Sequence, residues 1–289
     1  MTIRICKSAA ASLRILCTLL LCLGLMACTP SDSNSQTHQA SSRGDAAEPP
    51  TAFRLPEALR EVSGLALRPD GRLYAVADEV GHIFALHPET GTSDLVAQVG
   101  NPVVWDDFEG IATHGNVLWL TNSDGRLYTL RLDEASEPLI EDTGFGARCE
   151  IEGLSYHLQA RYLYFACKTP RQARYEAHLS LFAWSPGEGP MPQADVVVAL
   201  AEVNDDKKLH PSGVTVLADG SFLIIAAKER RWVHISDRGQ PIGRGKLDKQ
   251  DHPQAEGIAL RDDAIFIADE GKRRGRLQRY EITEFGIAP

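Results

Sequence analysis

Acidic and amide side chains occupy matching places in several segments of this sequence. One set stands directly before a glycine: Glu109, Glu152 and Glu256. A second set follows a short apolar run further along: Asp78, Asn122 and Asp269. Converging carboxylates raise one another's pKa, so a ring of them is costly to ionise unless a cation neutralises it. Calcium accepts roughly six to eight oxygen ligands in flexible geometry, and no Cys/His cluster favours zinc or copper. If folding brings both sets together, we expect a calcium site.

Basic side chains interrupt this acidic pattern. Lys168 and Lys228 end the corresponding apolar runs, Glu229 follows the second lysine, and His210 opens the segment HPSG. The lysines would neutralise part of the ring or hold an anionic group of a ligand, and His210 is a candidate general base. The sequence has no GxSxG elbow and no Ser/His/Asp signature. This favours binding over catalysis.

The acidic segments belong to an internal repeat. The motif glycines are separated by 46, 43, 60 and 44 residues, which is the period of a four-stranded propeller blade. They are Gly64, Gly110, Gly153, Gly213 and Gly257. Each begins a short apolar run, followed by a turn, a second apolar run and a third, alternating run. No run beyond the N-terminal region has helical periodicity, so we predict an all-β fold.

The repeat predicts a single β-propeller, with five four-stranded blades as the main expectation. Six blades would result if residues 185–209 hold further strands, but we attribute the long interval to an insertion at 169–177. The last repeat lacks a fourth strand. We expect residues 51–55, at the start of the domain, to supply it and close the ring, which removes exposed edges.

Propeller geometry explains why the two polar sets should meet. The first strand of a blade lines the channel and the second returns antiparallel beside it, so both sets lie at one mouth. Ser63 and Ser212 replace glutamate in two repeats. Asp106 and Asp107 have no counterparts in most repeats, and we expect them to form a solvated approach to the mouth.

The N-terminal residues predict export and lipidation. Three cations precede an apolar run at 15–26, which closes on a lipobox-like segment ending in Cys28. We predict a lipoprotein signal peptide at 1–27, a lipidated Cys28 with a disordered tether at 28–51, and the propeller at 52–289. Thr29 after the cysteine favours the outer membrane, facing the periplasm. The alternative is an ordinary secretory signal.

Charge and cysteine usage agree with an oxidising envelope compartment. Removal of the signal peptide takes away three cations and changes the formal net charge from −9 to −12, which makes nucleic acid an unsuitable partner. Two cysteines, Cys149 and Cys167, remain in the predicted domain. A hairpin turn near residues 159–160 would bring them together, so we predict a disulfide, with free buried thiols as the alternative.

Several motifs in order resemble one family. EVSGLA, DFEGIA with TNSDGRLY, EIEGLSY, HPSGVTV and QAEGIAL with IFIADEG are similar to the SdiA-regulated (YjiK/CarP-like) β-propeller family over residues 52–285. The resemblance implies an envelope-facing propeller linked to calcium, with a distant likeness to propeller phytases and lactonases. The resemblance implies that the six acidic and amide residues named in the first paragraph are metal ligands. The two serines and two lysines depart from the pattern and argue against a phytase-like site with several calcium ions.

These observations lead to one expected function and one alternative. We expect an outer-membrane lipoprotein that binds calcium at an acidic channel mouth and acts as a binding or sensing module in calcium or envelope homeostasis. Its further partner would be a small anionic molecule or a protein. The alternative is a calcium-dependent hydrolase of phytase-like or lactonase-like type, with a metal-bound water as nucleophile.

Overall fold

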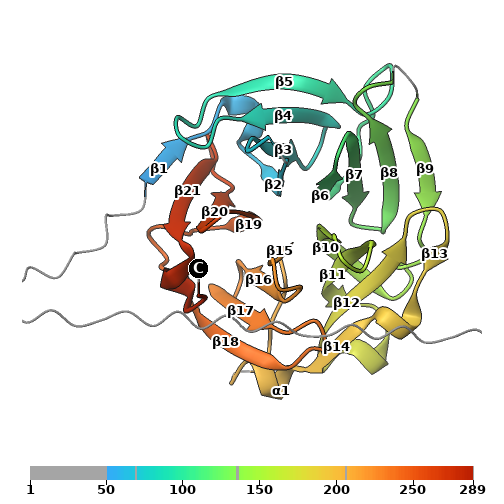
Figure 1. Ribbon diagram of the computed structural model, residues 1–289, viewed down its shortest axis with the longest axis vertical. Coiled ribbons are helices and arrows are strands. Elements are labelled where there is room, and N and C mark those ends of the chain that lie inside the picture. Colours follow the sequence, from blue (N-terminus) through green and yellow to red (C-terminus); the bar gives the residue numbers. More distant parts are fainter. Residues whose placement is uncertain (1–50, 69, 135–136, 206, 289) are drawn as a thin grey trace, which may run out of the picture. The chain divides into compact units, whose positions relative to one another are not determined.

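Short strands bounded by glycine and aspartate turns fold into five antiparallel sheets around a common axis (Figure 1). The computed structural model describes residues 51–288 except 69, 135, 136 and 206. The predicted signal peptide, Cys28 and all of the tether except Thr51 lie outside the described residues, and their assignments stay predictions. No helix in the described part of the chain has the length and apolar character needed to cross a membrane.

The strands follow the chain blade by blade, from the channel outwards. The first blade contains β2 (Val62–Leu67), β3 (Leu73–Ala77), β4 (His82–Leu86) and β5 (Ser93–Gln98). The second contains β6 (Phe108–His114), β7 (Val117–Asn122), β8 (Arg126–Arg131) and β9 (Leu139–Asp142). The fourth contains β15 (Gly213–Val216), β16 (Phe222–Ala226), β17 (Arg231–Ile235) and β18 (Pro241–Lys246).

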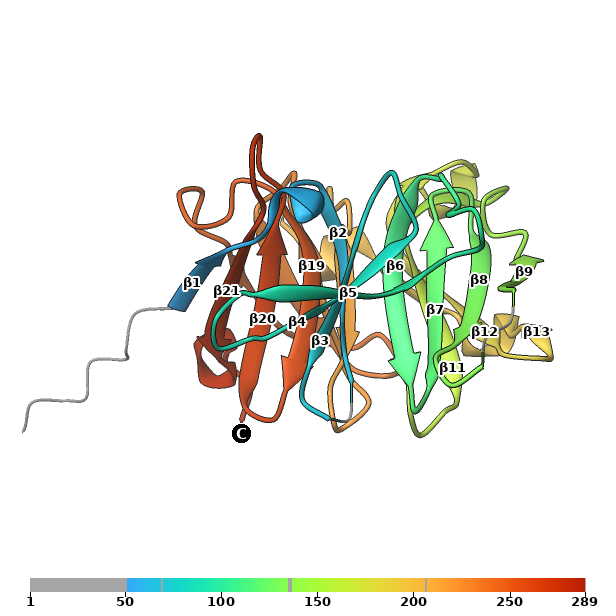
Figure 2. The ribbon, with the colours of Figure 1, turned by 90° about the horizontal axis from the view of Figure 1, so that it is seen from above.

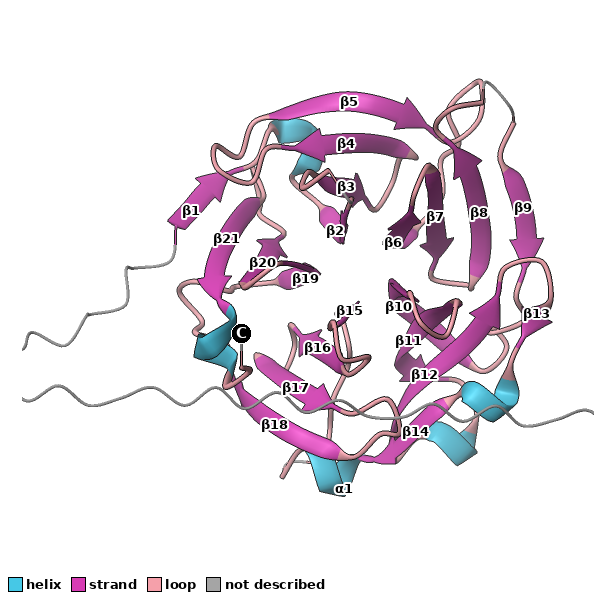
Figure 3. Cartoon of the chain, viewed as in Figure 1, coloured by secondary structure: helices cyan, strands magenta, loops and turns pink. Residues whose placement is uncertain are grey.

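The third blade accounts for the long repeat interval. Its inner strands are β10 (Cys149–His157), β11 (Tyr162–Pro170) and β12 (His178–Ser185), and both β13 (Gly189–Pro190) and β14 (Val196–Ala199) pair with β12. The predicted insertion at 169–177 is partly the extended end of β11 and partly the short helix η2 (Ala173–Tyr175). Further length lies in η3 (Pro192–Ala194) and α1 (Leu200–Val203), both on the periphery (Figure 3). The described part of 185–209 forms no sixth blade.

The fifth blade is completed by the beginning of the domain, as predicted. It contains β19 (Ala255–Arg261), β20 (Ala264–Asp269) and β21 (Arg276–Glu281), followed by η4 (Ile282–Phe285). The strand β1 (Thr51–Arg54) pairs antiparallel with β21, with Phe53 opposite Leu277. Figure 2 shows β1 beside β21 at the outer side of this blade. After β1, η1 (Glu57–Leu59) leads into β2. The ring therefore closes by joining the two ends of the domain.

The motif glycines allow the innermost strands to approach one another around the channel. A Cβ added at Gly110 would lie 2.7 Å from Leu154 N, and one at Gly213 would lie 2.8 Å from Glu256 O. A Cβ at Gly257 would lie 3.1 Å from Leu65 N, which closes the series back to the first blade. Each glycine thus contacts the backbone of a neighbouring blade. This close approach is the physical reason for the repeated glycine.

Apolar side chains fill the spaces between blades. Five buried clusters lie between successive blades around the ring, the last between the fifth and first blades. The second strands are covered on both faces; every residue of β16, for example, is buried. The blades are therefore wedged against one another, and the polar side chains at the ends of the inner strands are held on a packed scaffold.

Candidate functional site: the acidic channel mouth

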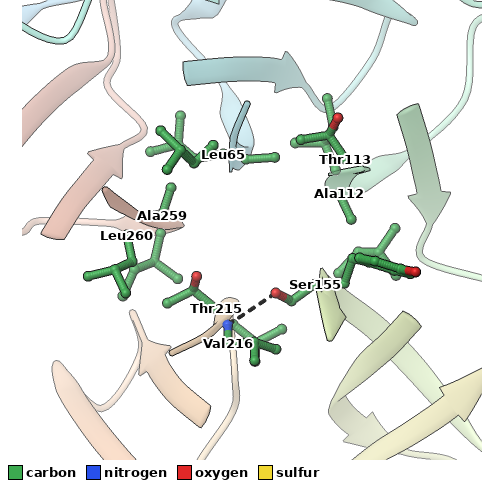
Figure 4. Close-up of a pocket in the computed structure, with 15 residues that line it drawn as sticks. Leu65, Ala112, Thr113, Ser155, Thr215, Val216, Ala259 and Leu260 are labelled. Carbon is green, nitrogen blue, oxygen red and sulfur yellow. Dashed lines mark hydrogen bonds between the residues drawn. The ribbon is translucent and has the colours of Figure 1, made fainter. Parts of the chain in front are cut away.

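The channel has two chemically different ends. The C-terminal halves of the inner strands surround a cavity of about 200 Å³ with no charged lining residue. Its polar groups include Thr113, Ser155 and Thr215, and the Ser155 hydroxyl accepts a hydrogen bond of 3.2 Å from Val216 N (Figure 4). The charged candidate residues lie instead toward the opposite end, where the inner strands begin.

β-Bulges place the three glutamates at that opposite mouth. The pairing of β6 with β7 shifts between Phe108 and Gly110, which leaves Glu109 as the extra residue, and the same shift in β19 leaves Glu256. In β10 the register shifts between Ile151 and Leu154, at Glu152. A bulge re-aims a side chain that would otherwise alternate with its neighbours. The same shift occurs in β2 between Val62 and Gly64, which leaves Ser63 as the extra residue, so the bulge accompanies the motif glycine and the glutamates occupy its extra position.

The three glutamates converge closely enough to perturb one another. Burial, followed by the charges of Glu152 and Asp107, raises the pKa of Glu109. Burial also raises the pKa of Glu152, although Lys168 opposes the shift. Burial and the charge of Glu152 raise the pKa of Glu256 to about 8. At neutral pH some of the glutamates at the mouth are therefore protonated.

Lys168 is the cation already present at this mouth. Its ammonium group donates to Glu152 Oε1, with the lysine side chain 32% exposed and the glutamate 4% exposed. Burial opposes the charged lysine, but the hydrogen bond and charge of Glu152 raise the pKa of Lys168. One ammonium faces three glutamates, so the ring retains an excess of acidic groups.

Asp78 lies in a second acidic group at the edge of the mouth. Burial, then the charges of Glu61, Glu79 and Glu270, raises the pKa of Asp78 to about 6. Its Oδ1 is buried and has no hydrogen-bond partner among the described residues. The neighbouring carboxyl Glu61 was not among the site residues predicted from the sequence, because it precedes a Ser-Gly and not a Glu-Gly motif.

Asn122 and Asp269 are held by other partners. The Asn122 amide donates to Asp106 at 3.1 and 3.0 Å and accepts from Arg126 N at 2.7 Å. Asp269 is buried and lies 2.8 Å from His252 Nδ1, and it also accepts from Gln254 N at 3.3 Å. These contacts fix loops before the inner strands. The role of both residues as metal ligands stays a prediction.

Asp106 differs from the expectation of a solvated approach. Its side chain is 18% exposed and accepts hydrogen bonds from Asn122, Tyr128 and Arg126. Burial opposes ionisation of Asp106, but these donors outweigh it and lower the pKa of the carboxyl. Asp106 therefore anchors the loop that precedes Glu109. Asp107 bonds to Ser123 and contributes negative charge to the mouth.

The remaining predicted residues belong to the third blade and to the loops around the inner strands of the fourth. Cys149 and Cys167 form a disulfide with a Cα–Cα distance of 5.6 Å, directly before Lys168. His210 Nδ1 lies 2.7 Å from Glu229 Oε1, and His210 N donates to Glu229 Oε2 at 2.9 Å. Lys228 and His210 line a cavity shared with Lys168. These groups therefore border the acidic ring without being part of it.

The glutamates fit the chemistry of a calcium site but not, in this conformation, its geometry. Their oxygens and negative charge are those that calcium prefers. Yet no group of three or more Asp, Glu, His or Cys side chains in the described part of the chain is arranged to hold a metal. Glu152 is engaged by Lys168. Ligation would require that ion pair to open.

Fold and site together define a five-bladed β-propeller with one acidic channel mouth. No family model matches the chain, and neither does any curated protein. A gluconolactonase structure from Xanthomonas campestris is 15% identical, with a TM-score of 0.49 over 75% of this chain and 71% of that one. A PQQ-bound aldose sugar dehydrogenase from Streptomyces coelicolor is 13% identical, with a TM-score of 0.47 over 81% and 98%. These weak likenesses carry no argument about activity.

Proposed function

We propose that the acidic mouth binds a calcium ion through Glu109, Glu152 and Glu256, and that the protein acts as a binding or sensing module. The observation that carries this proposal is the excess of buried carboxyl groups over the single facing lysine. Burial first, and then the charges of neighbouring carboxylates, raise their pKa values, so the fold supplies too little positive charge to keep all three ionised together. A divalent cation would supply that charge.

Three steps by the chain's own side chains would accompany binding. Glu109 and Glu256 would lose the protons that burial favours, and Lys168 would withdraw from Glu152. The packed inner strands would hold the glutamate backbones in place while the side chains reorient. Bound calcium would supply the positive charge that allows all three carboxylates to ionise together. Metal binding that displaces protons is a general form of linkage.

We place this activity in the cell envelope, as a lipoprotein of the SdiA-regulated type attached to the outer membrane through Cys28. The motif order and the lipobox-like segment support this placement. Binding is favoured over the phytase-like or lactonase-like alternative by the state of the histidines. Both ring nitrogens of His252 are engaged, Nδ1 by Asp269 and Nε2 by Tyr280, so this ring has no free nitrogen to act as a base. His210 bonds to Glu229 through Nδ1 and lines the neighbouring cavity of Lys168 and Lys228.

Calorimetric titration of calcium into the lipid-free protein tests the proposal. We expect a Kd in the range of about 10⁻⁷–10⁻³ M, which spans calcium sensors and extracellular calcium modules. Glu109→Gln and Glu152→Gln should each weaken binding by about tenfold or more, because each removes a charged ligand. Glu202→Gln, an exposed carboxyl on α1, should bind like the wild type. Absence of binding below millimolar calcium in the wild type would refute the site.

A further inference from the structure

A second cavity, of about 280 Å³, lies between the third and fourth blades next to the acidic mouth. Its polar lining is mainly basic: Lys168, Lys207, Lys208, Lys228, His178 and His210. Glu176 is the one carboxylate among the described lining residues, and Leu200, Leu209 and Pro170 supply apolar walls. In a protein with a formal net charge of −9, this concentration of cations in one hollow is a local reversal of charge.

The donors of this cavity are largely unengaged. Lys207, Lys208 and Lys228 form no ion pair with any residue that the structure describes. His178 Nδ1 is buried and has no hydrogen-bond partner among the same residues. A buried polar atom without a partner is costly, whereas Lys207, Lys208 and Lys228 are exposed and have ammonium groups that are free of described partners. One anionic ligand with several oxygen acceptors would contact these ammonium groups and give the His178 ring a partner.

Glu229 and Asn204 hold parts of the cavity lining in place. Glu229 holds the ring of His210 through Nδ1, which leaves Nε2 with no partner in the described structure. At the other side, Asn204 bonds to the backbone of both neighbouring lysines, accepting from Lys207 N at 3.0 Å and donating to Lys208 O. The carboxylate of Glu229 is therefore used to orient a donor rather than to neutralise the lysines.

Lys168 belongs to both the cavity and the glutamate ring. Its ammonium pairs with Glu152, and its side chain lines the basic cavity. We infer that the basic cavity binds a small polyvalent oxyanion, and that Lys168 couples this binding to occupancy of the glutamate ring. The coupling rests on the proposed function. A cation on the ring would release Lys168 from Glu152 and make its ammonium available to the anion, so each ligand would strengthen the other.

Titration of inorganic phosphate into the calcium-free, full-length domain tests the cavity without reference to the metal. We expect saturable binding that weakens about tenfold or more in Lys228→Gln and in Lys208→Gln, since each removes a charge-assisted contact. Lys272→Gln, an exposed lysine in the β20–β21 hairpin, should leave binding unchanged. Absence of saturation, or equal affinity in wild type and both cavity variants, would overturn the oxyanion site.

The coupling has its own readout. A non-precipitating probe, sulfate, is titrated with and without saturating calcium, and we expect calcium to tighten sulfate binding several-fold, as for typical coupling between sites. Glu152→Gln removes the competitor for Lys168, so it should tighten sulfate binding without calcium and abolish the response to it. If calcium binds but sulfate affinity does not change, the coupling is wrong while the proposed calcium site stands. If sulfate binds and calcium does not, the cavity stands and the calcium site fails.

Discussion

Glu256 shows how the fold holds a carboxyl group in an unfavourable place. Glu256 is the extra residue of a β-bulge at the start of an inner strand, and burial together with the charge of Glu152 raises its pKa to about 8 from the ordinary value of 4.5. Between these values the folded protein keeps a proton that the unfolded chain has lost. The free energy of unfolding therefore decreases as the pH rises, because ionising Glu256 is more costly in the folded protein than in the unfolded chain.

The stability of the metal-free protein should fall as pH rises through this window. The contribution of Glu256 is fully present below its unfolded pKa of 4.5 and is lost as the pH passes about 8. The slope is negative because the folded state binds more protons than the unfolded state. In Glu256→Gln the decrease in unfolding free energy over this pH range should be smaller by on the order of a few kcal/mol. Chemical denaturation at a series of pH values without divalent cations measures this difference.

Glu202→Gln serves as the control for this measurement, since that exposed residue should leave the pH dependence of the unfolding free energy unchanged. Parallel curves for wild type and Glu256→Gln would show that Glu256 does not titrate abnormally. The same experiment with saturating calcium should reverse the trend, because the ion stabilises the ionised carboxylates of the folded protein.

Asn122 and Asp269 mark the limit of residue-level inference from sequence. Both lie at the ends of second strands, as propeller geometry predicts. Their side chains, however, form hydrogen bonds to residues of nearby loops. Asp106 and His252, each in a loop before an inner strand, engage them. The repeat contains no information about these pairings, because the two loops have no equivalent in the other blades. Glu109, Glu152 and Glu256 were predictable because the bulge that places them repeats.

At the level of elements, the inner strands depend on glycine at one position. A Cβ at Gly110 would meet Leu154 N at 2.7 Å, a contact with backbone that cannot rotate away. We expect Gly110→Ala to lower the unfolding free energy by about 2 kcal/mol or more, since the neighbouring blade must shift. Thermal and chemical denaturation measure this change.

Gly243→Ala is the matched control. It lies in the outer strand β18 with ordinary φ, and its added Cβ would have its nearest contact, with Trp232, at 3.4 Å. It should be neutral or slightly stabilising. Equal destabilisation by the two substitutions would mean that the motif glycine has no special place in packing the blades.

The closing strand β1 is the other element whose role can be tested. Its four residues pair with β21, and Phe53 packs against the cluster between the fifth and first blades. A chain that begins at residue 55 should lose about 2–4 kcal/mol relative to one that begins at residue 51. It should also associate in solution, because β21 becomes an unpaired edge. Size-exclusion chromatography and denaturation measure both effects, and an unaltered monomer of equal stability would contradict closure by β1.

For the whole molecule, the number and order of blades were predictable, whereas the detail of the third blade was not. The glycine spacing of 46, 43 and 44 residues sets the blade size. The interval of 60 residues contains no repeat signal to show that β11 continues to Pro170 and that η3 and α1 follow. That irregular stretch also forms part of the basic cavity, so the least predictable region carries the second proposed site.

The two ends of the channel differ in their charge. One end is neutral and lined by apolar and hydroxyl groups, and the other gathers carboxyls whose protonation the fold favours. The account therefore requires that calcium, on binding, displace protons from the glutamate ring. A site of ordinary ionised surface carboxylates would bind calcium without releasing protons.

Calorimetric calcium titration of the wild type at neutral pH, in two buffers of different ionisation enthalpy, measures this displacement directly. The difference in observed heat gives the protons released per calcium ion. We predict release of about one proton or more, reduced in Glu256→Gln, because Glu256 with a pKa of about 8 is mostly protonated before binding. Identical heats in both buffers, or no calcium binding at all, would contradict the account.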